Sequence, residues 1–211
     1  FEEDLGERFW EALVDDAVLS TQLDGRQFGV ASTVSLSANN GLAEPSIALF
    51  ARYGTGDNAA VRAPLSPTPG LRYSDLATIN QDSATPAGVL NSVAAETLEV
   101  SEGDELEVGA FVTRDAERVR TTTLEVVHAV IANQGQGAMA GTRSPAVFTD
   151  LSTAQSMLDM EGQLNRCSLA FDNQLDDREV REAVQRVNDA MDAVMTAQDV
   201  GVVWTVDEET S

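Results

Sequence analysis

Two side chains in this sequence could support nucleophilic or acid–base chemistry, because the 211-residue chain contains one histidine and one cysteine. His128 lies within the apolar segment LEVVHAVIA, and Cys167 alternates with Leu169 and Phe171 on one face of a predicted strand. A cysteine nucleophile needs a basic neighbour that lowers the pKa of its thiol, and one histidine cannot form a two-histidine metal site. The favoured interpretation is a structural histidine and a buried, inert thiol. A hydrolase that uses Cys167 or His128 is the alternative.

The remaining motifs predict no site for chemistry. With 35 acidic residues, some carboxylates lie close together in any fold, so paired carboxylates carry no information here. The segment Gly135–Gly141 follows a predicted strand, but its last glycine is one position too late for the phosphate-binding pattern G-x-G-x-x-G. A calcium-binding loop of the D-x-D-x-D-G type is absent from the sequence. The sequence therefore assigns no catalytic residue, no cofactor and no metal ligand.

The charge of the chain is strongly negative. The formal net charge is −22, from 35 acidic and 13 basic residues. All of the basic residues are arginine, although lysine is among the commonest residues of globular proteins. At about 1 M salt the screening length falls to roughly 3 Å, so crowded carboxylates repel one another weakly. We interpret this composition as the surface of an extremely halophilic, archaeal protein. The charge also argues against nucleic acid and anionic lipid headgroups as partners.

The N-terminal part of the chain is predicted to begin with a long helix. Leu5, Phe9 and Leu13 recur every four residues, which predicts an amphipathic helix over residues 1–23. Gly25 is expected to end this helix. The next predicted elements are a strand at 28–36, a turn at 39–41, a strand at 45–53, a loop at 57–70 and a short helix at 73–81.

The rest of the chain mixes strands with helices. A small helix is predicted at Asn91–Leu98, and Ser152 with Gln155 predicts a capping box at the start of a later helix. Asp176 or Asp177 is expected to cap the most regular amphipathic helix. The other predicted elements are strands at 105–113, 120–132, 146–148, 164–171 and 201–206, a hairpin tip at 114–118 and a loop at 133–144. This mixture predicts an α+β fold.

One block of the sequence resembles the extracytoplasmic core domain of MacB/FtsX-type ABC transporter permeases. The resemblance rests on the small helix Asn91–Leu98, on the Gly103–Asp104 turn with the strand after it, and on the segment Val147–Gln155, which reads VFTDLSTAQ. It covers Val89–Met191 and includes the long helix near the C-terminus.

This resemblance implies an α+β fold with a porter-like α/β part, a β-rich insertion and an N-terminal stalk helix. It places the stalk helix at 1–24, the porter-like subdomain at 25–85 and 145–211, and the inserted subdomain at 86–144. In such permeases the domain lies outside the cell, between two membrane helices, and has no catalytic residues. The chain begins at Phe1, within a predicted helix, so we expect it to be part of a longer protein.

The function implied by the resemblance is mechanical. A non-catalytic extracellular domain relays ATP-driven motion to an extracellular substrate or partner protein, in lipoprotein, peptide or drug export or in the control of a partner. A cytoplasmic ATPase subunit acts through the membrane part of the transporter, and the full transporter forms a homodimer. The sequence identifies neither the substrate nor the partner. A soluble secreted binding or sensor domain is the alternative from a different functional class.

Overall fold

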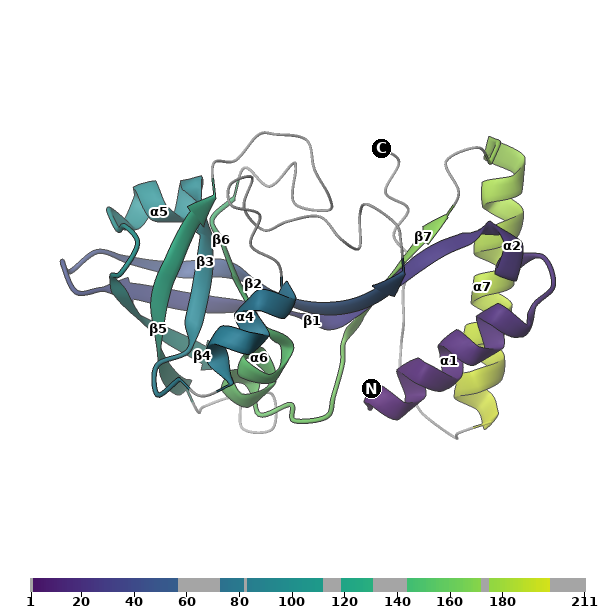
Figure 1. Ribbon diagram of the computed structural model, residues 1–211, viewed down its shortest axis with the longest axis horizontal. Helices are drawn as coiled ribbons and strands as arrows, with labels where there is room; N and C mark the ends of the chain where they lie inside the picture. Colours follow the sequence, from purple (N-terminus) through teal and green to yellow (C-terminus); the bar gives the residue numbers. More distant parts are fainter. Residues whose placement is uncertain are drawn as a thin grey trace. The chain divides into compact units, whose positions relative to one another are not determined.

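The computed structural model describes residues 2–56, 73–81, 83–111, 119–130, 144–171 and 175–197. Its internal contacts divide the chain into two compact units, one made of Phe1–Leu23 with Phe171–Ser211 and the other of Asp24–Ala170 (Figure 1). The first unit contains the helices α1 (Glu3–Asp15), α2 (Leu19–Gln22) and α7 (Asp177–Ala197). The second contains β1 (Leu23–Ala38), β2 (Ala43–Gly56), α4 (Tyr73–Asn80), β3 (Ala87–Asn91), α5 (Ser92–Leu98), β4 (Glu105–Phe111), β5 (Val119–Val130), β6 (Ala146–Thr149), α6 (Leu151–Leu158) and β7 (Arg166–Phe171). Strands β1 and β7 each extend by one residue across the boundary.

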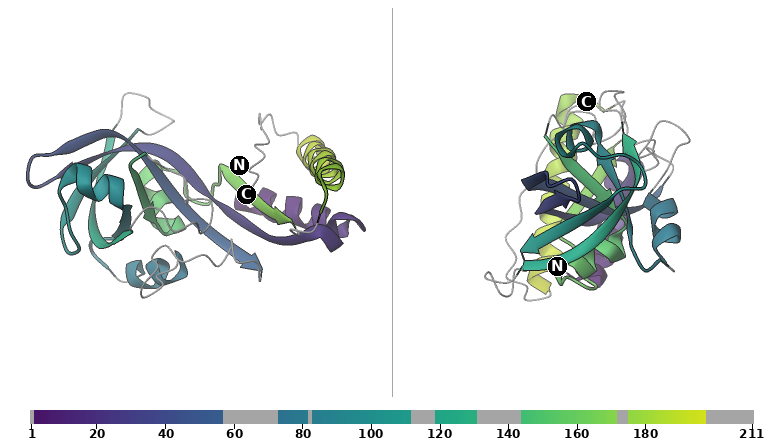
Figure 2. Two further views of the ribbon diagram at one scale, coloured as in Figure 1. Left: turned by 90° about the horizontal axis from the view of Figure 1, so that it is seen from above. Right: turned by 90° about the vertical axis from the view of Figure 1, so that its left-hand side faces the viewer.

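Six of the described strands in the second unit form a closed ring. Strand β1 pairs with β2, β2 with β6, β6 with β3, β3 with β5, β5 with β4, and β4 with β1. The β2–β6 and β3–β5 pairs are parallel and the other four pairs are antiparallel. Figure 1 and Figure 2 show β1 and β2 as long strands that run together past the shorter ones. This mixture of helices and strands confirms the predicted α+β fold.

Alternation along the strands directs the apolar side chains into the ring. On β4, Leu106 and Val108 are buried, whereas the neighbouring Glu105 and Glu107 are exposed, as the two-residue period of a strand requires. Helices α5 and α6 contribute to the same core. The core cluster includes Val34, Leu36, Ile47, Leu49 and Leu90 from the strands, Ala94 and Leu98 from α5, and Ala154, Met157 and Leu158 from α6.

Two strand–helix junctions in the second unit are built alike. Strand β3 continues into α5 through Asn91, and β6 continues into α6 through Asp150. Each of these side chains accepts a hydrogen bond from the backbone N–H three residues further on, at 2.9 Å and 3.1 Å respectively. Each helix then ends at a residue in the left-handed conformation, Glu99 with φ 51° and Asp159 with φ 57°. Side-chain caps matter here because helices this short are marginal by themselves.

The structure corrects the predicted capping box of Ser152 and Gln155. The Ser152 hydroxyl donates a hydrogen bond to Oδ1 of Asp150 (2.7 Å), and the Gln155 side-chain amide donates to the carbonyl of Gln163 (2.8 Å). Strand β6 reaches Thr149 and helical geometry begins two residues later, so the extended cap position between them falls on Asp150 (φ −73°, ψ 163°).

The helix predicted over 1–23 is interrupted. Helix α1 ends at Asp15, and Asp16 has extended backbone geometry (φ −72°, ψ 120°). Its Oδ1 accepts hydrogen bonds from the backbone N–H groups of Val18 (2.8 Å) and Leu19 (3.0 Å), where α2 begins. A short Asp side chain that bonds to nearby backbone competes with a continuous helix.

The apolar faces predicted for the first and last helices are confirmed. Helices α1 and α7 contact each other within the first unit. The buried apolar side chains are Leu5, Phe9 and Leu13 on α1 and Ala183, Val187 and Met195 on α7. Strand β1 begins at Leu23 and contains Gly25, so this glycine does not end a helix as predicted.

Strand pairing joins the predicted inserted subdomain to the rest of the second unit. Strands β3, β4 and β5 come from 86–144, and β3 pairs with β6 and β4 with β1, which lie outside that range. The bounds of the predicted subdomains stay a prediction. The predicted loop 57–70, hairpin tip 114–118 and strand 201–206 lie outside the described residues, as does the loop 133–144 except for its last residue.

Candidate functional site

Cys167 lies on β7, where it is half-buried rather than buried as predicted, in an environment that suppresses its reactivity. Burial raises the pKa of the thiol from an ordinary value of 9.0 to about 12, although the Arg26 guanidinium nearby acts in the opposite direction. The Arg26 side chain is buried, and its guanidinium carbon lies 5.0 Å from the centroid of the Phe28 ring. A thiol with a raised pKa stays protonated at neutral pH and is a poor nucleophile. This environment supports the interpretation of Cys167 as an inert thiol.

We expect a thiolate-dependent maleimide to label Cys167 at least tenfold more slowly in the native domain than in the unfolded chain at pH 8. The raised pKa leaves very little thiolate in the folded state, whereas the unfolded thiol has its ordinary pKa. Mass spectrometry of timed samples, with and without urea, measures both rates. Equal rates in the two states would restore Cys167 as a candidate nucleophile.

Cys167 on β7 and His128 on β5 lie on strands that are not neighbours in the sheet, because β4 and β1 lie between them. His128 lies on β5, paired with Val89 of β3 and four residues beyond Leu124. Leu124 pairs with Leu106 of β4, and Leu106 pairs with Ala38 of β1.

Cys167 instead lies two residues from Asn165, whose side chain accepts a hydrogen bond from the backbone N–H of Ala31 and donates one to the carbonyl of Ala31 (both 2.8 Å). Around the other side of the ring, Ala31 pairs with Phe50 of β2, Phe50 with Phe148 of β6, Phe148 with Val89 of β3, and Val89 with His128. The strand pairing therefore separates His128 from β1 by three strands on this path, and it provides no direct contact of the kind that a Cys–His catalytic pair needs.

A buried polar cluster joins α4, β3, β6 and α6, and the sequence did not reveal it. The Asn80 side chain accepts a hydrogen bond from the backbone N–H of Ala87 (2.6 Å) and donates to Oδ2 of Asp150. The Thr149 hydroxyl donates to the carbonyl of Ala87 (2.9 Å). Burial alone would raise the pKa of Asp150, but hydrogen bonds from Thr153, Asn80 and Ser152 lower it below its ordinary value of 3.8.

The chemistry available to this cluster is structural. Asp150 is 2% exposed, and both of its oxygens accept hydrogen bonds, Oδ1 from Ser152 and the Thr153 backbone and Oδ2 from Asn80. The lowered pKa makes this carboxylate a weak base, and its burial keeps it away from a substrate. One sequence signal could have found this residue, since Asp150 comes two residues after the predicted strand 146–148. Its partner Asn80 lies 70 residues away and gives no local signal.

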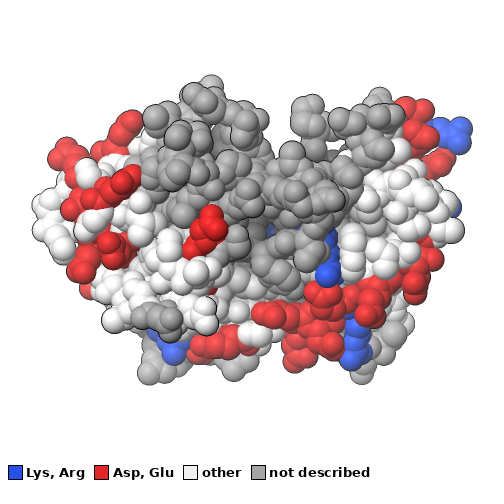
Figure 3. Space-filling view, viewed as in Figure 1, with Lys and Arg blue, Asp and Glu red and all other residues white. Residues whose placement is uncertain are grey.

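Acidic side chains dominate the described surface. On the face drawn in Figure 3, carboxylates cover much more of that surface than arginines do. Some arginines form ion pairs at the surface, such as Arg8 with Asp4 (2.8 Å) and Arg186 with Asp16 (2.9 Å), and exposed pairs of this kind contribute little to stability. Within the described ranges, no group of three or more His, Cys, Asp or Glu side chains is placed to hold a metal ion.

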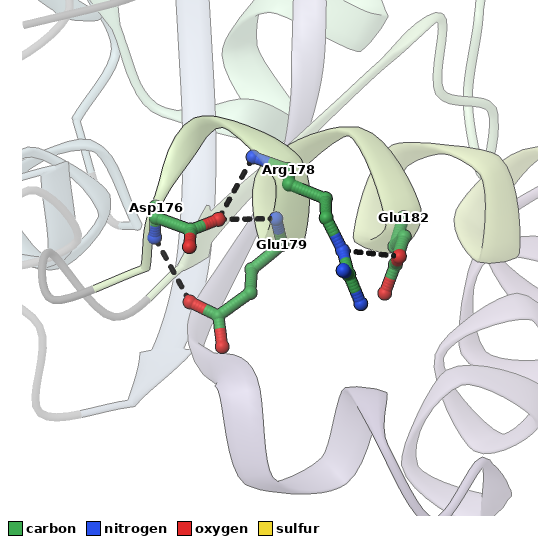
Figure 4. A network of polar contacts seen from close by, with 4 residues as sticks. All are labelled: Asp176, Arg178, Glu179 and Glu182. Carbon is green, nitrogen blue, oxygen red and sulfur yellow. Dashed lines mark hydrogen bonds and ion pairs between the residues drawn. The ribbon is translucent and has the colours of Figure 1, made fainter.

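The start of α7 carries a network of four of these charged residues (Figure 4). Asp176 Oδ1 accepts hydrogen bonds from the backbone N–H groups of Arg178 (2.8 Å) and Glu179 (2.9 Å), while Glu179 accepts one from the backbone N–H of Asp176 (2.9 Å). The bonds from Glu179 and Arg178 lower the pKa of Asp176. This reciprocal arrangement is a capping box. It confirms the predicted cap and selects Asp176 rather than Asp177, and it identifies a helix terminus rather than a binding site.

Comparison with known proteins gives information on the fold. No protein-family model matches the sequence, and no curated protein matches it. The structure is similar to the extracellular domain of the noncanonic ABC-type transporter YknZ from Gram-positive bacteria, with a TM-score of 0.53 and 12% identity over 90% of this chain and 83% of that chain. It is also similar to the periplasmic region of MacB from Actinobacillus actinomycetemcomitans, with a TM-score of 0.52 and 10% identity over 96% of this chain and 85% of that chain.

No helix in the described part of the chain is both long and apolar enough to cross a membrane. The similarity to both solved structures extends over most of each chain and includes helices and strands of both units. The chain therefore shares its fold with the extracytoplasmic domains of two ABC-type transporters.

Proposed function

We propose that this chain is the extracellular domain of an ABC transporter permease. In this role it relays ATP-driven motion to an extracellular substrate or partner protein and performs no catalysis itself. The observation that carries the proposal is the similarity of 90% and 96% of the chain to the extracytoplasmic domains of YknZ and MacB. The block at Val89–Met191, which resembles the MacB/FtsX-type core domain, adds support from the sequence.

The proposal places the domain outside the cell and implies partners for the full protein. A cytoplasmic ATPase would act through the membrane part, and two copies of the permease would form the transporter. The acidic, lysine-free composition supports a halophilic, archaeal origin. The negative surface makes nucleic acid an unfavourable partner. The transported substrate, or the extracellular protein that the domain controls, is a lipoprotein, a peptide, a drug or a regulated partner.

A non-catalytic role is supported by the two side chains that could do chemistry. Cys167 has a raised pKa, and its strand β7 is not a neighbour of β5, which carries His128. Both oxygens of the buried Asp150 carboxylate accept hydrogen bonds. Each of these arrangements fits a structural role, as expected of a domain that transmits motion.

The test uses the full-length natural protein in cells, with Cys167→Ser and a new cysteine at the exposed Glu96 of α5. We expect a membrane-impermeant maleimide added to intact cells to label this cysteine. A cytosolic protein with a reactive cysteine, followed in the same cells, should stay unlabelled until lysis. Affinity purification in detergent should also recover an ABC-type ATPase. Labelling only after lysis, or purification without any ATPase, would refute the proposed role.

A further inference from the structure

We propose that the outer face of the β4–β5 pair is a docking surface for a protein segment that combines an aromatic or aliphatic side chain with arginine or lysine. This inference does not rest on the transporter role. The face consists of the outward positions of two adjacent antiparallel strands, and it is called here the β4–β5 outer face. Its residues are Glu105, Glu107, Gly109 and Phe111 on β4 and Val119, Thr121, Thr123 and Glu125 on β5.

An exposed apolar pair occupies one end of this face. Phe111 is 62% exposed and Val119 is 51% exposed, the two largest values among the large apolar side chains of the described residues. They lie directly opposite each other in the ladder, where cross-strand side chains are close enough to form one contact surface. The inward residues of β4 already fill the core, so the fold does not require a phenylalanine at position 111. An exposed aromatic residue at such a place is typical of an interface anchor.

Uncompensated negative charge occupies the other end. Glu105 lies directly opposite Glu125, and Glu107 is the next outward residue on β4. All three side chains are exposed, and none of them forms an ion pair with another described residue. Like charges directly opposite each other in a sheet are destabilising, and a cationic group placed between them would remove that repulsion. The face therefore favours a partner that is positively charged at this end.

The spacing along the strand defines the partner further. Phe111 and Glu107 are four residues apart on β4, which corresponds to about 14 Å at roughly 3.4 Å per residue. Between them, Gly109 is buried, because the Ser35 side chain of β1 occupies the space where a side chain at this position would lie, whereas Thr121 and Thr123 of β5 are exposed. A partner segment can therefore run over Thr121 and Thr123 while an apolar side chain contacts the Phe111–Val119 pair and a basic side chain reaches the carboxylates.

Other occupants fit this face less well. A second copy of the chain would bring the same carboxylates against each other, and anionic lipid or nucleic acid would add further negative charge. A protein segment with basic and apolar side chains satisfies both ends at once, because it covers apolar surface and pairs with the carboxylates.

The experiment selects peptides from a displayed library of random 12-residue sequences on the natural domain. The KCl concentration is the lowest at which circular dichroism shows the domain to be folded, so that charge attraction is screened as little as possible. We expect the selected peptides to combine an aromatic or aliphatic residue with arginine or lysine. Phe111→Ser with Val119→Ser, and separately Glu105→Gln with Glu125→Gln, should each weaken binding of the selected peptides at least fivefold in fluorescence anisotropy.

The matched control combines Ile79→Ser with Glu96→Gln, which makes the same kinds of change at exposed positions of α4 and α5. Its affinity should stay within twofold of the natural domain, and circular dichroism establishes that all variants are folded. Selection without enrichment of this side-chain combination would overturn the proposal. Equal loss of binding in the control and in the outer-face variants would overturn it as well, because binding would then follow general charge and apolarity.

Discussion

Replacement of Asp150 by alanine should lower the free energy of unfolding of the second unit by about 3 kcal/mol. The estimate combines about 1 kcal/mol for the lost helix cap with about 2 kcal/mol for hydrogen bonds to a buried charged group that would no longer form. The partners left behind are the backbone N–H of Thr153, the Ser152 hydroxyl and the Asn80 amide. Urea denaturation at constant KCl, followed by circular dichroism, measures the loss.

Two control variants separate the cluster from general effects. Asp150→Asn keeps a side chain that can cap α6, so it should lose less stability than Asp150→Ala. Glu96→Ala removes a carboxylate at an exposed position of α5 in the same unit, where surface substitutions alter stability by about 0.5 kcal/mol or less. If Asp150→Ala were no more destabilising than Glu96→Ala, the cluster would not stabilise the fold.

The lowered pKa of Asp150 adds a pH dependence to this prediction. The folded-state pKa lies below the ordinary value of 3.8, so the native protein favours the ionised form. Its contribution is fully present above pH 3.8 and is lost as the pH falls through the folded-state value. The difference in unfolding free energy between the natural domain and Asp150→Asn should therefore shrink as the pH falls below about 4.

The second large effect expected is a rise of the thermal midpoint by at least about 5 °C between 0.1 M and 2 M KCl, which corresponds to roughly 2 kcal/mol for a domain of this size. With a net charge of −22, self-repulsion destabilises the compact state when screening is weak. The screening length falls from about 10 Å at 0.1 M salt to about 3 Å at 1 M salt.

A variant tests whether charge causes this effect. Glu105→Gln with Glu125→Gln removes two opposed carboxylates and should raise the midpoint in 0.1 M KCl more than in 2 M KCl. Sucrose at equal osmolality serves as a control for solvent exclusion without screening. A midpoint in 0.1 M KCl that equals or exceeds the one in 2 M KCl would contradict the interpretation of the surface as halophilic.

The sequence predicted those elements well that depend only on residues close together in the chain. The small helix predicted at Asn91–Leu98 is confirmed as α5, and the structure adds that Asn91 is its cap. The turn at Gly103, where φ is 88°, was predicted from the Ser-Glu-Gly-Asp stretch. The resemblance of Val89–Met191 to a transporter domain depended on the order of such elements, and the structural comparisons support that order.

Features that depend on distant residues were not predictable in the same way. Closure of the ring requires β6 to lie between β2 and β3. The sequences of these three strands carry no information on their order in the sheet. The Asn80–Asp150 contact joins residues 70 positions apart. The break at Asp16 was missed because its side chain bonds to the backbone, a contact that competes with the amphipathic repeat favouring a continuous helix.

Strand β1 determines how the second unit would respond to tension. It is paired with β2 from Gly25 to Ser37 and with β4 from Val34 to Ala38. A pulling force applied at Leu23 would act along the axis of β1. This direction is perpendicular to the hydrogen bonds that join β1 to its two antiparallel neighbours. The bonds along its length would then resist sliding together, in shear, rather than separating one after another as in unzipping. Force spectroscopy that pulls from residue 23 should therefore find β1 mechanically strong compared with the single short ladder that holds β6 to β3.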